Sequence, residues 1–241
     1  MPILSNTEDS KRPLRIGGIV PLSTTDYPGA LAAVVFLQGC PWRCAYCHNP
    51  HLIAPDAPTT QYWPDVLDWL LRRRGLLDAV VFSGGEPTLQ AGLADAMRAV
   101  RALGFKVGLH TAGAYPKQLR TVLSLCDWVG LDIKAPFAGY DALTGVPGSA
   151  RRVRDSLAAL VASGVAHECR TTVHQSLHRL RDLLDLSDEL LMAGAECYVL
   201  QPFRAAGCRD SALIEADDQV STAALLQRTA NLSPGVMTRS V

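Results

Sequence analysis

Short apolar runs alternate with longer amphipathic stretches along most of the chain. The runs are rich in Val, Leu and Ile and are bounded by glycines or polar residues, which is typical of strands buried on both faces. The longer stretches carry apolar residues at helical spacing, and several of them end at a glycine. The predicted strands are 31–37, 79–82, 106–110, 128–133, 168–173 and 197–201, and the predicted helices are 65–74, 89–103, 116–125, 153–163, 180–192 and 223–231.

About six strand–helix units therefore follow one another. Such an alternation predicts an α/β fold with a parallel sheet, because right-handed helical crossovers carry the chain from each strand to the next. The pattern does not decide between an open sheet and a barrel, although six units are fewer than the eight of a closed barrel. We expect a single domain over residues 14–232, with a flexible N-terminus at 1–13 and a C-terminal tail at 233–241.

The composition limits the classes of partner. The chain has 241 residues, of which 48% are hydrophobic, and this suits one large domain. Lys and Arg number 23, as do Asp and Glu, so the basic excess of nucleic-acid binding proteins is missing. The first dozen residues are polar, and no apolar run approaches the roughly 18 residues of a membrane span. We therefore expect a cytoplasmic protein with no nucleic-acid and no membrane partner.

Three of the seven cysteines, Cys40, Cys44 and Cys47, lie within eight consecutive positions. Thiolates this close repel one another and oxidise unless a cation holds them, commonly zinc or an iron–sulfur cluster. Structural zinc and ordinary iron–sulfur clusters take four protein ligands, so the trio implies either a fourth ligand such as His48 or His51, or an iron left open. The other four cysteines lie singly in apolar segments, as small buried side chains do: Cys126, Cys169, Cys197 and Cys208.

The other unusual polar clusters also follow predicted strands. The carboxyl ends of parallel strands lie at one edge of a sheet or barrel, where α/β proteins build their sites. We therefore expect these clusters to converge with the cysteines. They are 83–87, 110–113, 132–134, 170–172 and Gln201.

The spacing Cys-x3-Cys-x2-Cys, with Tyr46 before the third cysteine, resembles the motif of radical S-adenosylmethionine (SAM) enzymes. Segments 24–29 and 47–50 read Thr-Thr-Asp-Tyr-Pro-Gly and Cys-His-Asn-Pro. They further resemble activases of glycyl-radical enzymes, especially those of the anaerobic ribonucleoside-triphosphate reductase. The resemblance runs from about Ile16 to about Phe203, and it implies a partial (β/α)6 barrel.

The resemblance also implies a function. Cys40, Cys44 and Cys47 would hold a [4Fe-4S] cluster, and SAM would bind its fourth iron. Reductive cleavage of SAM would yield a radical that removes hydrogen from one glycine of a partner enzyme, which the resemblance identifies as anaerobic ribonucleotide reductase. A flavodoxin- or ferredoxin-type protein would supply the electron. No catalytic side chain is implied, since the cluster and SAM carry the chemistry.

Several SAM contacts are implied at the strand ends. Gly84, Gly85 and Glu86 correspond to the segment that binds the SAM amino group, where carbonyls and a carboxylate at a glycine bend offer acceptors. Lys134 corresponds to a lysine that contacts the SAM carboxylate. The other implied contacts are Tyr46, Thr111, Asp132, Arg170 and Gln201, of which Gln201 corresponds to a residue near the ribose.

Purely structural roles remain open for these residues. The glycine segment is also compatible with a tight turn. Asp132 and Lys134 share one face of a strand and are compatible with a buried ion pair. Arg170 is compatible with an arginine that extends from the core to the solvent.

One segment departs from the family pattern. After the third predicted strand the activases typically read Asp-Thr-Asn-Gly, whereas residues 110–113 read His-Thr-Ala-Gly. In relatives this aspartate helps to hold a monovalent cation beside SAM. His110 therefore either removes the cation site or moves it onto Asp132 and Thr111.

The partner protein is expected to reach the site near Asp26 and His48, although both also suit ordinary turns. The same residues are also compatible with two other classes of function. One is a radical SAM enzyme for a small molecule, similar to the deazaguanine-forming synthases, and the other is a zinc-binding or electron-carrying module. Residues 51–80 contain no cysteine, so the ferredoxin-like insertion of some activases is not expected there.

Overall fold

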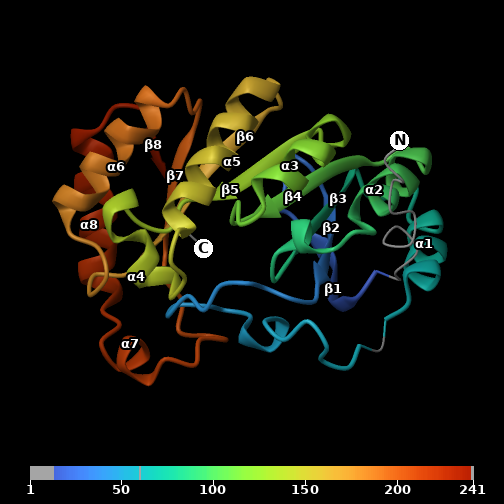
Figure 1. Cartoon of the computed structure of the whole chain (residues 1–241), viewed down its shortest axis with the longest axis horizontal. Helices are drawn as coiled ribbons and strands as arrows, with labels where there is room; N and C mark the ends of the chain where they lie inside the picture. Colours follow the sequence, from blue (N-terminus) through green and yellow to red (C-terminus); the bar gives the residue numbers. More distant parts are fainter. Residues whose placement is uncertain (1–13, 60, 240–241) are drawn as a thin grey trace, which may run out of the picture.

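A computed structural model describes residues 14–59 and 61–239 of the chain. The expected flexible N-terminus, 1–13, lies outside these residues. A curved sheet of eight strands runs through the described part, and helices cover its outer side (Figure 1).

The strands follow one another across the sheet in chain order. The first strand is antiparallel to the second, and all later neighbours are parallel. Because parallel neighbours cannot be joined by a tight hairpin, helical crossovers connect most of them. The strands are β1 (Ile16–Ser23), β2 (Ala32–Leu37), β3 (Ala79–Gly84), β4 (Lys106–Thr111), β5 (Trp128–Asp132), β6 (His167–Val173), β7 (Tyr198–Pro202) and β8 (Val236–Thr238).

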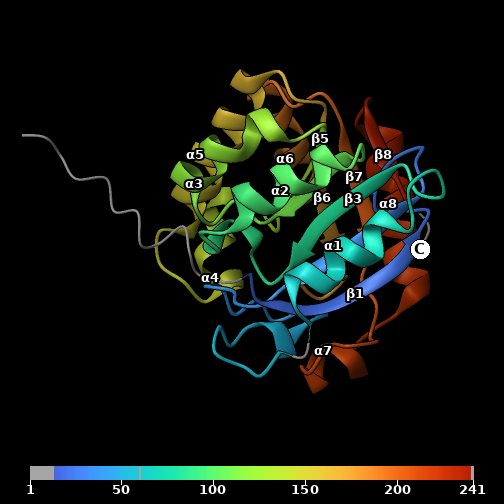
Figure 2. The same ribbon diagram turned by 90° about the vertical axis from the view of Figure 1, so that its right-hand side faces the viewer.

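The crossover helices bury one apolar face each. In the second α-helix, for example, the buried residues Leu93, Met97 and Val100 recur at spacings of four and three. Figures 1 and 2 show the helices around the convex side of the sheet. The α-helices are α1 (Trp63–Leu71), α2 (Leu93–Ala102), α3 (Pro116–Val122), α4 (Tyr140–Thr144), α5 (Ser149–Ser163), α6 (Leu180–Met192), α7 (Ser211–Glu215) and α8 (Gln219–Leu232).

The side chains of the sheet divide between two apolar clusters. Val35 of β2 and Phe82 of β3 join the large cluster beneath the helices. Their chain neighbours Val34 and Val81 point to the other face, where they form a small inner cluster with Trp128 of β5. Burial on both faces explains why these strands read as continuous apolar runs.

The loop between β1 and β2 fills one end of the barrel interior. The ring of Tyr27 lies 5.5 Å from the ring of Trp128, measured between centroids. A Cβ at Gly108 of β4 would lie 2.9 Å from Val81 Cγ2 and 3.0 Å from Tyr27 Cδ2, so a larger residue would crowd this ring. The inner cluster lies at the amino ends of the strands, and space for a site is therefore left at their carboxyl ends.

The predicted alternation is confirmed. The six predicted strands correspond to β2 through β7, and the six predicted helices correspond to α1, α2, α3, α5, α6 and α8, with bounds that agree within four residues. The short helices α4 and α7 were not predicted, because five residues are too few to show a helical period.

The pattern also misses the two edge strands. β1 contains two glycines and a proline, so it forms no apolar run. The expected C-terminal tail is wrong over Val236–Thr238, because β8 pairs in parallel with Tyr198–Leu200 of β7. Three residues are too few to show the alternation of apolar and polar side chains that is typical of a strand. Pairing with β7 alone makes them part of the sheet.

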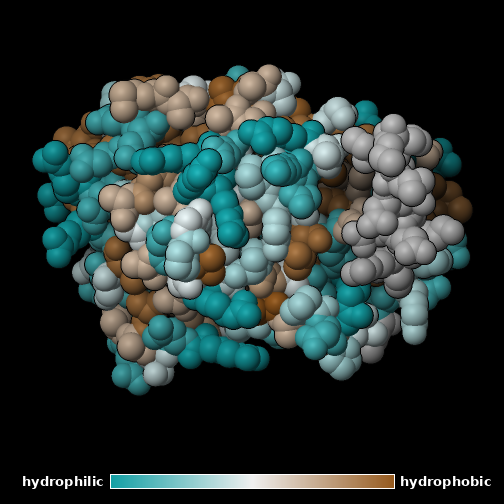
Figure 3. Space-filling view, viewed as in Figure 1, coloured by the Kyte–Doolittle hydropathy of each residue, from teal (hydrophilic) through white to brown (hydrophobic). Residues whose placement is uncertain are grey.

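The molecular surface is mixed in hydropathy. On the face shown in Figure 3, hydrophilic and hydrophobic side chains are interspersed. None of the described helices combines the length and the apolar character needed to cross a membrane.

Candidate active site

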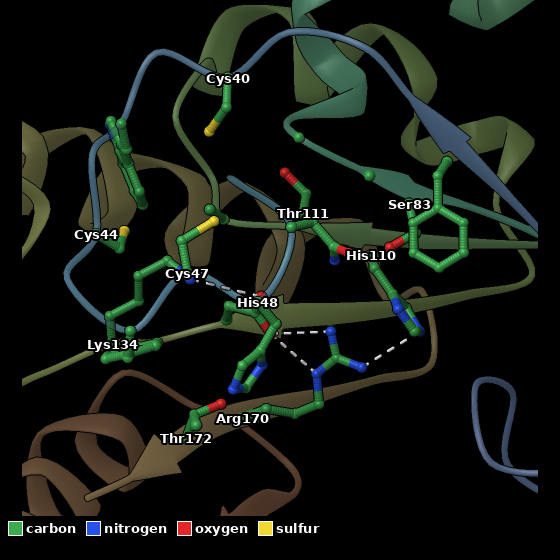
Figure 4. Close-up of a pocket in the computed structure, with 18 of the residues that line it drawn as sticks. Cys40, Cys44, Cys47, His48, Ser83, His110, Thr111, Lys134, Arg170 and Thr172 are labelled. Carbon is green, nitrogen blue, oxygen red and sulfur yellow. Dashed lines mark hydrogen bonds and ion pairs between the residues drawn. The ribbon is translucent and has the colours of Figure 1, made fainter. Parts of the chain in front are cut away.

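A cavity of about 340 Å³ lies at the carboxyl ends of the strands (Figure 4). The polar clusters that follow the strands converge on it, as expected from the sequence. With the exception of Glu86, every residue that the sequence assigned to the cluster, to SAM or to the partner protein lines this cavity. These residues are Asp26, Cys40, Cys44, Tyr46, Cys47, His48, Gly84, Gly85, Thr111, Asp132, Lys134, Arg170 and Gln201.

Backbone hydrogen bonds hold the cysteine loop on both of its sides. The N–H of Gly39 donates to the carbonyl of Leu52 at 2.7 Å, and that of Cys40 donates to the carbonyl of Ile53 at 3.0 Å. Farther along, the N–H of Arg43 donates to the carbonyl of Thr144, at the end of α4. The loop that carries the thiols is therefore anchored to two separate parts of the chain.

All three thiols are free and partly buried. Burial raises the pKa of Cys40 to about 12, and it also raises the pKa of Cys44. Both groups therefore stay protonated at neutral pH until a metal ion displaces the proton. Protonated thiols are poor nucleophiles, so these groups do not have the character of reactive cysteines.

The surroundings of the thiols fit an iron–sulfur cluster. Among the described residues, no three His, Cys, Asp or Glu side chains lie close enough to hold a single metal ion, and the thiols instead border one common cavity. Three thiols around one space suit a cluster, whose ligands bind different iron atoms. Two buried nitrogens that border the cavity, Trp42 Nε1 and His48 Nε2, have no hydrogen-bond partner in the described chain. A polar group bound in the cavity would satisfy them.

The glycine bend after β3 packs directly on the cysteine loop. A Cβ at Gly84 would overlap the backbone of Leu37, and a Cβ at Gly85 would overlap the carbonyl of Gly39. Hydrogen bonds reinforce this contact, since Gly85 N–H donates to the Leu37 carbonyl at 2.9 Å and Glu86 N–H donates to the Gly39 carbonyl at 2.8 Å. Glycines are thus required here for close backbone approach.

The position of Glu86 corrects the expectation for its side chain. The carboxylate is fully buried and accepts hydrogen bonds from Thr111 Oγ1 at 2.7 Å, Thr88 Oγ1 at 2.6 Å, Thr88 N at 3.1 Å and Ala112 N at 2.9 Å. A buried carboxylate is tolerated only when such donors surround it. It therefore ties the bend to the end of β4, and the carboxylate does not face the cavity.

The opposite wall of the cavity is charged. Nε and Nη2 of Arg170 donate to Asp132 Oδ1 at 3.1 and 2.9 Å, and Lys134 Nζ lies 3.6 Å from Asp132 Oδ2. Burial raises the pKa of Asp132, but the two cations outweigh burial and hold this pKa below its usual value. Burial likewise opposes the charge of Lys134, but Tyr46 and Asp132 hold its pKa above the usual value. Both partners are thus charged at neutral pH.

Two residues that the sequence did not assign to the site fix the backbone of Lys134. The Tyr140 hydroxyl accepts a hydrogen bond from Lys134 N–H at 3.2 Å and donates to the Asp132 carbonyl at 3.2 Å. The Lys134 carbonyl lies 3.0 Å from His178 Nε2. The ammonium group lies 5.6 Å from the centre of the Tyr46 ring. Lys134 is therefore held at its backbone and at its tip.

His110, which replaces the aspartate of the family pattern, is buried between charged neighbours. Its Nε2 lies 2.8 Å from the Asp26 carbonyl oxygen and 3.2 Å from Arg170 Nη1. Burial, followed by Arg170, lowers the pKa of His110 to about 3, so the ring is neutral. The alternative cation ligands are engaged within the protein, because Asp132 binds Arg170 and Thr111 binds Glu86.

The residues expected near the partner protein also have structural contacts. Asp26 accepts a hydrogen bond from Ser23 and so stabilises the turn after β1. The ring of His48 lies 5.5 Å from that of Phe203, measured between centroids.

Gln201, which was expected near the ribose of SAM, has a hydrogen bond within the protein. Its Nε2 donates to Thr172 Oγ1 at 3.0 Å. The cavity lining also includes residues that no motif indicated, among them Phe36, Arg204 and Arg239.

Comparison with known sequences places the chain in a family. Residues 34–184 match the radical SAM superfamily. A protein of Methanocaldococcus jannaschii, provisionally assigned as a glycyl-radical enzyme activating enzyme, is 30% identical over 197 residues, which cover 78% of this chain and 79% of the relative. The pyruvate formate-lyase-activating enzyme of Clostridium pasteurianum is 36% identical over 137 residues, which cover 54% of this chain and 57% of the relative.

Solved structures agree in fold. The crystal structure of Streptococcus suis SuiB bound to precursor peptide SuiA matches with a TM-score of 0.66 at 14% identity, covering 86% of this chain and 48% of SuiB. The chain thus spans about half the length of SuiB, and the similarity concerns the fold alone. The family match over more than half of the sequence, together with the shared fold and the converging cysteines, shows that the chain belongs to the radical SAM superfamily.

Proposed function

We propose that this chain is a radical SAM activase that generates a glycyl radical on a partner enzyme. The observation that carries the proposal is the cavity itself, in which three thiols border the same space as the cations Lys134 and Arg170. The M. jannaschii relative supports the class of reaction.

The family implies SAM and a [4Fe-4S] cluster, and the residues of the cavity suit both. Cys40, Cys44 and Cys47 would supply thiolates to three irons. When bound, the cluster and SAM supply a one-electron cleavage that yields a carbon radical able to remove hydrogen from glycine. No side chain of the protein needs to gain or lose a proton in this step.

The other cavity residues would bind and orient SAM. Lys134 is charged, nearly buried and fixed at its backbone, so it suits the SAM carboxylate. Arg170 has the forked geometry that also suits a carboxylate. Carbonyls at the Gly84–Gly85 bend suit the amino group, and the Gln201 amide suits ribose hydroxyls.

Access for a protein substrate would come from the open side of the sheet. β1 and β8 are at opposite edges of the strand order, and an incomplete barrel leaves room for a polypeptide loop beside the cavity. The bound partner would then exclude water from the radical.

We further propose anaerobic ribonucleotide reductase as the partner and a flavodoxin- or ferredoxin-type protein as the electron donor. The segments 24–29 and 47–50 support this partner, because they resemble those of the reductase activases. The partner loop would meet the cavity near Asp26 and His48, both of which line it.

The test is anaerobic incubation of the reduced, cluster-loaded chain with SAM and a candidate reductase. Electron paramagnetic resonance should then show a glycyl-radical signal on the reductase, and deoxyadenosine should accumulate in proportion. A parallel incubation with pyruvate formate-lyase examines the choice of partner. SAM cleavage with no radical on either protein would refute the activase function, and stoichiometric zinc without iron would refute the cofactor.

A further inference from the structure

Arg239, the last residue that the structure describes, reaches the cavity from the C-terminal strand. Its N–H donates to the Leu200 carbonyl of β7 at 2.9 Å, so the pairing of β8 fixes its backbone. Its guanidinium donates two hydrogen bonds to Glu168, from Nη1 to Oε1 at 3.0 Å and from Nη2 to Oε2 at 2.8 Å. This is the two-pronged geometry of strong arginine–carboxylate pairs.

Glu168 depends on this contact. Its side chain lies inside the barrel on β6 and is 5% exposed. In the described part of the chain, Arg239 supplies its only hydrogen-bond donors. The next cation is Arg170, whose Nε lies 3.9 Å from Glu168 Oε1. A buried carboxylate that loses its partner is costly, so a nearby cation is drawn to it.

Arg170 therefore lies between two carboxylates. Residues 168 and 170 share the inner face of β6, because side chains alternate along a strand. At present, Nε and Nη2 of Arg170 both bind Asp132, and Nη1 lies 3.2 Å from His110 Nε2. The Arg170 side chain is 8% exposed, which leaves it few other partners.

We infer that Arg239 is a positioning residue of the cofactor cavity: by neutralising Glu168, it leaves Arg170 bound to Asp132. Without Arg239, the guanidinium of Arg170 turns toward Glu168. Asp132 then has Lys134 as its remaining cation. In the original chain Lys134 Nζ lies 3.6 Å from Asp132 Oδ2, and in the variant Asp132 draws the ammonium group of Lys134 closer and away from the ligand. The inference rests on the proposed function in one respect only, which is that SAM is the ligand that Lys134 and Arg170 bind.

The experiment compares Arg239→Gln, Glu168→Gln and the double variant, each with its cluster intact. The dissociation constant of SAM is measured by perturbation of the reduced-cluster spectrum. Arg239→Gln should weaken binding on the order of tenfold, at the lower end of what loss of an outer partner costs. The double variant should return to within about threefold of the original chain, because the competing carboxylate is gone.

Two further variants control for nonspecific effects. Arg228→Gln removes an exposed arginine from α8, and it should leave SAM affinity unchanged. Arg239→Lys retains the charge without the fork, so its SAM affinity should lie between those of the original chain and Arg239→Gln. Arg239→Lys also replaces Arg239→Gln in the comparison if the latter variant does not fold.

A crystal structure of Arg239→Gln gives a readout that does not need SAM. Arg170 Nε should lie within hydrogen-bonding distance of Glu168 and no longer bind Asp132. An unmoved Arg170, or a double variant as weak as Arg239→Gln, would overturn the inference. If the original chain fails to bind SAM while Arg170 still moves, the proposed function fails and the positioning role of Arg239 is upheld.

Discussion

The two sides of the cavity are held together by different forces. On the cysteine side, backbone hydrogen bonds and glycine contacts join segment 39–53 to the bend at 84–86. On the opposite side, charges that are buried or half-buried hold one another in place. These charged residues are Asp132, Lys134, Glu168, Arg170 and Arg239.

The difference predicts different sensitivities. Backbones in contact leave no room for an added atom, so the cysteine side should respond to the size of a side chain. Buried ion pairs are stable only when every charge has a partner, so the charged side should respond to charge rather than to volume. Four changes examine this contrast, from the largest expected effect to the smallest.

Cys44→Ser should remove the chemistry of the cysteine side. A serine hydroxyl is a poor ligand for iron, so we expect loss of nearly all bound iron and of SAM cleavage, with the fold retained. Iron and sulfide analysis with circular dichroism checks this. Cys208→Ser is the matched control, because its Sγ lies 3.6 Å from the Ala45 carbonyl of the same loop without lining the cavity. Full iron content in Cys44→Ser would contradict the ligand assignment.

Gly85→Ala should show that this side responds to size. The added Cβ would overlap the Gly39 carbonyl, and we expect a loss of about 2–3 kcal/mol in the free energy of unfolding, as for other overpacked sites. Urea unfolding measures the loss. Gly18→Ala is the control, since a Cβ there meets no atom within 4 Å. Equal stability of Gly85→Ala and Gly18→Ala would contradict the prediction that the cysteine side responds to the size of a side chain.

Lys134→Met should show that the charged side responds to charge. The substitution keeps an unbranched side chain but removes the ammonium group from a side chain that is 13% exposed. We expect SAM affinity to fall by about 2 kcal/mol, roughly thirtyfold, the usual value of a hydrogen bond to a charged group. Lys106→Met, at the exposed start of β4, should have no effect. Unchanged affinity in Lys134→Met would disprove its contact with the carboxylate.

His110 should make the charged side sensitive to pH. Its pKa is lowered from 6.5 to about 3 in the folded chain, first by burial and then by Arg170. The unfolded chain binds a proton near pH 6.5, so stability falls as the pH decreases from 6.5 toward 3. We expect this group to contribute a loss of about 1.4 kcal/mol per pH unit over this range, and His110→Gln should remove that contribution. Burial also lowers the pKa of His48 and of His178, so a smaller dependence should remain.

Urea unfolding at pH 7.5 and pH 5.5 measures this dependence. His51→Gln, at an exposed position, should retain the slope of the original chain. The same slope in His110→Gln would show that other groups carry the pH dependence.

Much of the fold and part of the site follow from local sequence. Strands buried on both faces form apolar runs, so β2 through β7 could be predicted. The cysteine trio could be recognised because its chemistry lies within eight consecutive residues. The convergence of Lys134 and Arg170 with these cysteines followed from their places at strand ends.

Glu86 shows the limit of such reasoning. Its position at the edge of the site could be predicted, but the direction of its carboxylate could not. That direction depends on Thr111 and Ala112, whose donors lie 25 and 26 residues away along the chain. A motif contains no information on which groups will surround a side chain in space.

The sequence by itself determined the strands β2 through β7 and the main helices between them, the three thiols and the glycine bend, because each of these depends on neighbours in the chain. Only the tertiary structure decided which residues hold the charged wall. Tyr140 and His178 reach Lys134 from other segments, and Arg239 reaches Glu168 across 71 residues. The physical reason is that buried charges are balanced by whatever lies nearest in space, and a three-residue strand with no period of its own brings Arg239 there.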